Sequence, residues 1–143
     1  MIPVIVVDTN VVVSALLNPE AAPRTVLRSC LTGVAKPLMG NALFSEYEDV
    51  VRRESVFQDS ILSLDERLAF LDDFFSVCQW VSVYYLWRPN LSDESDNHVL
   101  ELAIAGGAQS VVTGNAKDFD RAALRFPDIE IVTPRDFVSR GGY

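Results

Sequence analysis

The sequence predicts an α/β fold in which a central parallel sheet of four to five strands lies between helices in a three-layer α/β/α arrangement. Short apolar, β-branched segments alternate along the chain with longer segments whose apolar residues recur every three to four positions. The first strand is a continuous apolar run, which is typical of a strand buried on both faces of a parallel sheet. Strands and helices that alternate in this way form parallel sheets with helices on both faces.

Length and composition favour one globular domain over residues 1–143. The chain has 143 residues, of which 49% are hydrophobic, and no repeat, low-complexity tract or linker divides it. We expect no membrane segment, because no apolar run approaches the ~18 residues needed, and no signal peptide, because Asp8 interrupts the first run. Cys30 and Cys78 lie far apart in apolar helical contexts, which predicts unreactive thiols in a cytosolic protein.

The formal charge of −8, from 12 Lys and Arg against 20 Asp and Glu, is unusual for a protein that binds nucleic acid. Such proteins generally offer a basic face to the phosphates. Two interpretations remain open. The acids can form a solvated surface that keeps the protein soluble. Alternatively, several of them cluster in a cation site, where a bound metal would reverse the local field.

Asp8 directly follows the first apolar run, so it is predicted to lie at the carboxyl end of a buried strand. In open α/β sheets, ligands bind at that end. A carboxylate there is costly to desolvate unless something pairs with it. A metal ion is one such partner. The alternative is that Asp8 only caps the helix that follows, since aspartate is a good N-cap.

The other elements follow from apolar periodicity, turn residues and helix stop signals. After the first strand and helix, the sequence predicts strands at residues 36–39, 79–87, 110–113 and 129–132 and helices at 21–33, 42–53, 64–77 and about 95–105, with a last helix opening at Pro134. The charged residues of the 64–77 helix, Arg67 included, are expected on a solvated face.

Three further acids are candidates for the same crevice. Glu46 borders the apolar stripe of its helix, although the edge of such a stripe is also an ordinary place for a surface acid. Asp96 shares the buried face of its helix at the first turn, where the helix dipole favours a carboxylate. Asp118 follows the 110–113 strand. It is either one of the acids in this crevice or an ordinary acid at the start of a helix. Helix capping explains Asp93 well.

Carboxylates held close together repel each other and raise each other's pKa values. A hard divalent cation removes that cost, and Mg²⁺ or Mn²⁺ takes oxygen ligands while leaving room for phosphate oxygens. Such a site activates water and stabilises charge on a phosphodiester. The single histidine, His98, argues against a catalytic triad or a histidine-rich zinc site and is expected on a helix surface.

Four segments in order give the chain a resemblance to a known family. They are residues 7–11 (VDTNV), 43–51 (LFSEYEDVV), 93–103 (DESDNHVLELA) and 111–119 (VVTGNAKDF), and the segment 132–137 (VTPRDF) also fits. With them the sequence resembles the PIN-domain family, close to the VapC-like ribonucleases that are the toxin components of prokaryotic toxin–antitoxin systems. The resemblance spans essentially the whole chain. Each motif alone is weak, but four in order at suitable spacing are fairly specific.

The resemblance implies a PIN-like (Rossmann-like) fold and an endoribonuclease that cleaves single-stranded RNA with Mg²⁺ or Mn²⁺. It carries the catalytic, metal-binding acids onto Asp8, Glu46 and Asp96. Residues in supporting polar positions are Thr9, Asn10, Asp93 and Thr113, and basic residues that can guide the RNA backbone are Lys117, Arg121 and Arg125. The implied partners are the RNA substrate, a cognate antitoxin protein and a second copy of the chain in a homodimer.

The fourth acid is where this sequence departs from the family. The family often has Asp two residues after the Ser or Thr that ends the strand, and here Asn115 holds that place. Asn115 can bind metal through its amide oxygen without adding charge, or Asp118 can substitute as a catalytic metal ligand. We favour Asp118, because a site of three carboxylates and one amide holds two ions less well than a site of four carboxylates. The alternatives to a nuclease are a catalytically silent PIN-like binding module and, more distantly, a small-molecule phosphatase.

Overall fold

The central sheet has five parallel strands in the order β3-β2-β1-β4-β5. The computed structural model describes residues 2–83, 94–119 and 126–141, with only the backbone at residues 94–97 and 118. The strands are β1 (Val4–Val7), β2 (Lys36–Met39), β3 (Gln79–Trp80), β4 (Ser110–Val112) and β5 (Glu130–Val132). The helices are α1 (Thr9–Leu17), α2 (Ala22–Leu31), α3 (Asn41–Val51), α4 (Leu64–Val77), α5 (Glu94–Gly106), the 3₁₀ helix η1 (Ala116–Phe119) and α7 (Pro134–Gly141).

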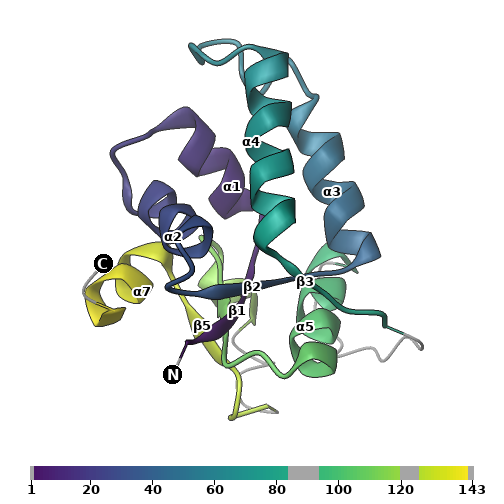
Figure 1. Ribbon diagram of the computed structural model, residues 1–143. Helices are drawn as coiled ribbons and strands as arrows, with labels where there is room; N and C mark the ends of the chain where they lie inside the picture. The colour runs from purple at the N-terminus through teal and green to yellow at the C-terminus, as the bar shows by residue number, and fades with distance from the viewer. Residues whose placement is uncertain (1, 84–93, 120–125, 142–143) are drawn as a thin grey trace.

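The path of the chain through the sheet places the helices in two layers around it (Figure 1). From β1 the chain moves outward to β2 and then to β3, with α1 to α4 on the way. Helix α5 then carries it back past β1 to β4, and α5 contacts β1, β2 and β4. Because parallel crossovers are right-handed, this change of direction puts α5 on the face opposite α1 to α4. The predicted α/β fold with a parallel sheet is confirmed.

Strand β1 is the centre of the sheet and of the core. It pairs with β2 on one side and with β4 on the other, where Val6 lies opposite Val111. Ile5, Val6 and Val7 are at most 1% exposed, as a strand covered on both faces requires. The ladder continues past the strand ends, since the N–H of Asp8 donates to the Val112 carbonyl and that of Thr113 to the Val132 carbonyl, both at 2.9 Å. Asp8 and Thr113 therefore lie at the same edge of the sheet.

Two expectations about α4 and the strand after it need correction. Arg67 is 1% exposed rather than solvated, because its Nε and Nη1 donate to the carbonyls of Val51 and Leu62, each at 3.0 Å. The strand predicted at 79–87 is only two residues long in β3, although the Val81 N–H still donates to the Met39 carbonyl at 2.8 Å. Among the described strands, β3 pairs with β2 alone, and residues 84–87 lie outside the described ranges.

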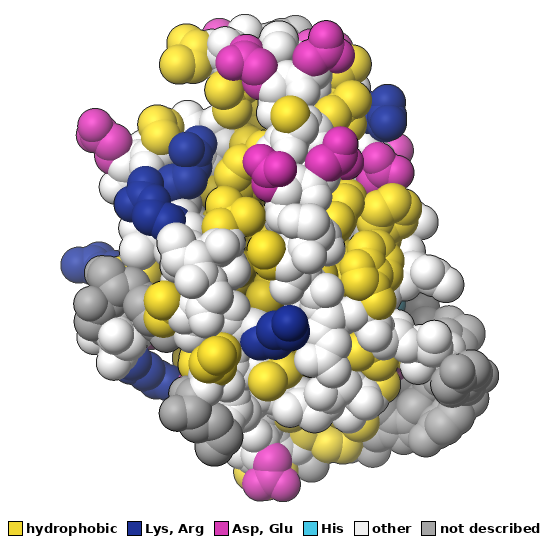
Figure 2. Space-filling view, in the orientation of Figure 1, with side chains coloured by type: hydrophobic (Ala, Val, Ile, Leu, Met, Phe, Trp, Pro, Cys, Tyr) yellow, Lys and Arg dark blue, Asp and Glu magenta, His cyan; other side chains and the backbone are white. Residues whose placement is uncertain are grey.

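The charges are unevenly spread over the surface in Figure 2. Acidic side chains gather over α4 and the top of the molecule, whereas most of the Lys and Arg side chains on this face lie towards α2 and α7. Part of the acidic excess is thus an ordinary solvated helix face, since Asp65, Asp72 and Asp73 of α4 are exposed. Within the described ranges, every helix is too short or too polar to cross a bilayer.

Candidate active site

Asp8 joins the end of β1 to the start of α1 and is 5% exposed. It is the N-cap of α1, and its Oδ1 accepts a hydrogen bond from the Thr9 N–H at 2.8 Å. Its Oδ2 accepts two more, from the Thr113 hydroxyl at 2.8 Å and from Asn10 Nδ2 at 3.0 Å. The capping interpretation is therefore correct, but capping alone does not account for the bond to Thr113, which follows the neighbouring strand.

The pKa of Asp8 is raised above the ordinary aspartate value of 3.8. Burial is the largest cause, and the negative charge of Glu46 adds to it. The hydrogen bonds from Thr113 and Thr9 lower the pKa, and His98 lowers it slightly, but burial prevails. Among the described residues, the hydrogen bonds to Asp8 thus only partly compensate the cost of burying its charged form.

Asn10 links Asp8 to the segment that follows β4. Its Nδ2 also lies 3.3 Å from the Thr113 hydroxyl oxygen, and its Oδ1 accepts the Gly114 N–H at 2.8 Å. The Thr113 hydroxyl in turn accepts the Asn115 N–H at 3.0 Å. A Cβ at Gly114 would lie 3.1 Å from Asn10 Oδ1, a tight contact that favours glycine at this position. These bonds hold the ends of β1 and β4 in one arrangement.

Helix α3 brings Glu46 to the same edge of the sheet. The hydroxyl of the fully buried Tyr47 donates to the carbonyl of Val7, the last residue of β1, and so anchors the helix there. One position earlier, Glu46 Oε1 accepts a hydrogen bond from the Thr9 hydroxyl at 2.5 Å. The Glu46 side chain is 31% exposed. It therefore faces the crevice beside Asp8 and is not simply a surface acid.

His98 is a site residue that the sequence analysis misplaced on a helix surface. Its Nε2 lies 2.8 Å from Glu46 Oε2, its side chain is 18% exposed, and its Nδ1 is buried with no hydrogen-bond partner within the described part of the chain. Helical periodicity could not reveal this contact, because the two residues lie 52 positions apart on different helices. The only signal in the sequence was the place of His98 two residues after Asp96.

The remaining predicted residues are only partly placed. The backbone of Asp96 lies in the first turn of α5, as expected, but its side chain and that of Asp118 lie outside what the structure describes. Asp93, Arg121 and Arg125 also fall outside the described ranges. Asn115 and Lys117 are exposed. The choice between Asn115 and Asp118 as the fourth ligand therefore stays a prediction.

The donor set that the structure describes suits a hard cation. Asp8 and Glu46 supply carboxylate oxygens, each already oriented by hydrogen bonds, and their mutual repulsion would fall if a cation lay between them. No group of three or more His, Cys, Asp or Glu side chains within the described part of the chain is arranged to hold a metal. Of the predicted ligands, the described side chains that meet at this edge of the sheet are those of Asp8 and Glu46.

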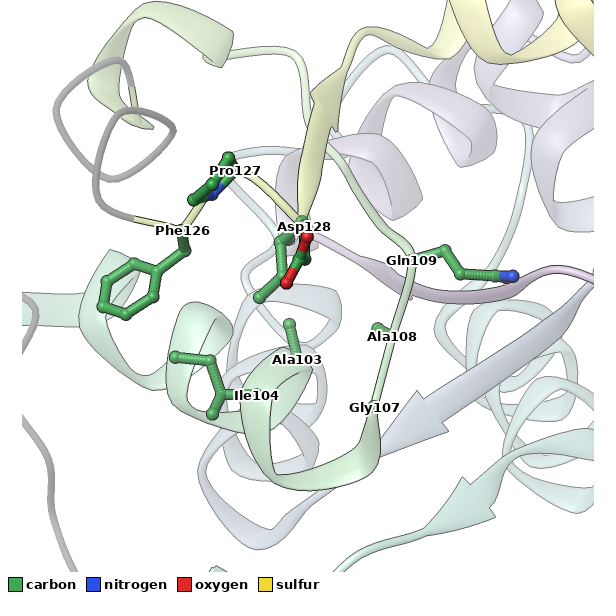
Figure 3. A pocket seen from close by; sticks show the side chains of 9 residues that line it. Ala103, Ile104, Gly107, Ala108, Gln109, Phe126, Pro127 and Asp128 are labelled. Carbon is green, nitrogen blue, oxygen red and sulfur yellow. The ribbon is translucent and has the colours of Figure 1, made fainter.

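Pockets lie at both ends of the strands in the described part of the chain. One, of about 470 Å³, lies at the amino ends of β4 and β5, where Ile104 of α5 and Phe126 contribute to its walls (Figure 3). It is far from Asp8, which lies at the carboxyl end of β1. Another, of about 330 Å³ at the carboxyl ends, is lined by Asn10 and Gly114 and therefore adjoins the Asp8 cluster.

Comparisons with known proteins identify the family of the chain and a solved structure with a similar fold. The sequence model described as "PIN domain" matches residues 4–117. No curated protein matches the chain in sequence. Among solved structures, the fold is similar to a chain in the crystal structure of VapBC2 from Rickettsia felis bound to a DNA fragment from their promoter. That similarity has a TM-score of 0.61 at 17% sequence identity and covers 91% of this chain and 98% of that one. Since the family match spans most of its residues, the chain belongs to the PIN-domain family.

Proposed function

We propose that this protein is an endoribonuclease that cleaves single-stranded RNA with the help of Mg²⁺ or Mn²⁺. One observation carries the proposal: two carboxylates from separate elements, Asp8 and Glu46, are oriented by hydrogen bonds at the carboxyl edge of the sheet. They lie where the strand order reverses between β1 and β4, which is where open α/β sheets bind ligands. Membership of the PIN family, whose members are generally nucleases, supports it.

The residues around the carboxylates hold them in place. Thr113, Asn10 and the Thr9 N–H all donate to Asp8, so they oppose the effect of burial on its charge. Glu46 is held on one oxygen by the Thr9 hydroxyl and lies against His98 at the other. Asp96 enters this proposal from the first turn of α5, and Asp118 or Asn115 from the segment after β4.

Asp8, Glu46 and Asp96 would hold the cation. Bound there, it would lower the pKa of a water molecule and offset the charge that develops on the phosphodiester. The same ion would remove the repulsion between Asp8 and Glu46. The chain's own contribution is a rigid arrangement of oxygen donors, which saves the cost of organising them during the reaction.

We further propose that the protein is the toxin of a toxin–antitoxin pair. The resemblance of the fold to a chain of VapBC2 supports this assignment, as do the sequence motifs. A ribonuclease of this kind needs a partner that restrains it, and a homodimer belongs to the same proposal. Expression of the chain alone should slow bacterial growth. The Asp96→Asn form should not, and equal toxicity of both forms would contradict the assignment.

A cleavage assay tests the central proposal. Wild-type protein should cut single-stranded RNA in millimolar Mg²⁺ and lose the activity in EDTA. Asp8→Asn should reduce the rate by at least about 10²-fold, because it removes charge where the cation binds. The matched control is Asp72→Asn, which removes one exposed carboxylate from α4 and should cut like the wild type. Equal rates for the Asp8→Asn and wild-type proteins would reject the proposal.

The competing function is a PIN-like module that binds a partner without cutting RNA. The observation that favours it is Asn115, an uncharged residue where the family often carries an acid. Such a module would show no Mg²⁺-dependent cleavage but would still bind its partner after Asp8→Asn. The assay above, run beside a binding measurement on the same two proteins, separates the two functions.

A further inference from the structure

The pocket between α1, α2 and α7 shares part of its wall with the Asp8 cluster. Its volume is about 330 Å³, and Asn10 and Gly114 belong to both. Asn10 lies between the pocket and Asp8, because its Nδ2 donates to Asp8 while its Oδ1 accepts the Gly114 N–H. A group seated in the pocket would therefore lie one side chain away from the Asp8 carboxylate.

The lining of this pocket suits a nucleoside. Most of it is small or apolar, contributed by Val11, Ala21, Ala22, Pro23 and Pro134, with hydroxyls from Ser14 and Thr133. Apolar walls with a few polar groups suit the flat face of an unstacked base and the hydrogen-bonding groups at its edge. Ligand pockets generally measure ~300–1,000 Å³, so this one has room for one nucleoside and not for a longer stretch of strand.

The charge at this pocket favours a phosphate despite the acidic net charge of the chain. Arg135 lines the pocket, is exposed, and takes part in no ion pair with any other described residue. Its neighbour Asp136 is exposed too but is not part of the lining. Helices α2 and α7 both begin at the pocket, and the positive ends of their dipoles add to the charge of Arg135.

We infer that this pocket receives the base and ribose of the nucleotide next to the scissile phosphate, and that Arg135 contacts the phosphate of that nucleotide. The inference rests on the proposed ribonuclease function. Ser14 and Ala22 carry small side chains and so leave the room that a base needs. The pocket then makes cleavage depend on which base occupies one position beside the cut.

Binding in EDTA tests the pocket independently of cleavage. A fluorescent single-stranded RNA of about eight nucleotides is titrated with each protein at several salt concentrations. Ser14→Leu, which fills the pocket from an exposed position, should weaken binding three- to tenfold. Arg135→Ala should weaken it and reduce the slope of log K against log salt by ~0.7, the loss of one phosphate contact.

Two exposed residues outside the lining provide matched controls. Ser139→Leu on α7 adds the same side chain, and Arg28→Ala on α2 removes the same charge. Both should bind RNA like the wild type. Thermal melts of the four variants should match the wild type, since all four positions are exposed. If each pocket variant binds RNA as tightly as its control, or if the wild type binds no RNA, the inference is wrong.

Cleavage of a random-sequence RNA pool in Mg²⁺, read by sequencing the product ends, gives the second measurement. The wild type should prefer certain bases at one position beside the cut, and Ser14→Leu should change the preference there alone. An unchanged preference would overturn the inference while leaving the ribonuclease function intact. If the wild type cuts nothing, the ribonuclease proposal fails, and the binding data in EDTA still decide the pocket. If Ser14→Leu keeps RNA binding but escapes a restraining protein partner, the pocket binds protein and the inference is wrong.

Discussion

At the scale of single residues, Asp8 is a buried carboxylate whose charge is disfavoured by its surroundings. Its pKa in the folded protein lies above the ordinary 3.8, so between these two values the native state holds more protons than the unfolded state. In metal-free buffer the wild type should therefore lose stability relative to Asp8→Asn as the pH rises through this window. Urea unfolding of both proteins from pH 3.5 to 7 measures it. A stability difference that stays constant with pH would contradict the prediction.

His98 contacts the second carboxylate, Glu46, and another side chain with a hydrogen-bond donor can make the same contact. Because Nε2 lies 2.8 Å from Glu46 Oε2, glutamine can keep a hydrogen bond there while leucine cannot. Outer partners of metal ligands are generally worth about 10–100-fold in activity. We predict that His98→Leu lowers kcat for RNA cleavage by about that factor and that His98→Gln retains most of it. Equal losses in both variants would indicate that His98 acts through packing instead.

At the scale of elements, Arg67 joins α4 to the end of α3 and to the segment between them. It donates to the carbonyls of Val51 and Leu62, pairs with Glu54, and lies over the Phe57 ring at 4.5 Å from its centre. Arg67→Met leaves two carbonyls without their donor and should destabilise the fold by about 2–4 kcal/mol in urea unfolding. The control, Arg53→Met, breaks an exposed pair and should cost under ~0.5 kcal/mol.

Local signals identified the elements better than they identified contacts between them. The helix at 64–77 was predicted with the observed ends, and Ser63 and Glu66 form a capping box at its start. Asp8 was located because a buried strand and a helix meet there. Arg67 and His98 were misplaced. Periodicity predicts which face of a helix a residue lies on, but it does not predict which residue from a distant segment a polar side chain contacts there. Asn10 as the bridge to Gly114 likewise needed the pairing of β1 with β4.

At the scale of the whole molecule, the buried apolar residues form one cluster that runs from Ile5 in β1 to Phe137 in α7. We accordingly propose a single domain and predict one cooperative unfolding transition. Mg²⁺ at 100 times its dissociation constant should stabilise the native state by ~2.7 kcal/mol, a rise of several degrees in Tm. Asp8→Asn should abolish the rise. Calorimetry on protein stripped of metal measures both, and an unchanged Tm at millimolar Mg²⁺ would count against the cation site.

The two cysteines have the unreactive thiols that their apolar helical contexts predicted. Burial raises the pKa of Cys30 and of Cys78 to about 12, so both are protonated at neutral pH and poor nucleophiles. Cys30 is buried in the core cluster and Cys78 is partly buried against it. The sequence analysis succeeded here because thiol reactivity depends on local burial, which the apolar helical context already indicated.

The hydrogen bond between Thr113 and Asp8 spans 105 positions of the chain. A ribosome that adds ~5–20 residues per second needs about 5–20 s to travel that distance. Throughout this interval β1 and α1 exist without β4, and the Asp8 carboxylate lacks the hydroxyl that holds it. The centre proposed for catalysis is therefore completed only after Thr113 has been synthesised. A polypeptide released before Thr113 cannot assemble it.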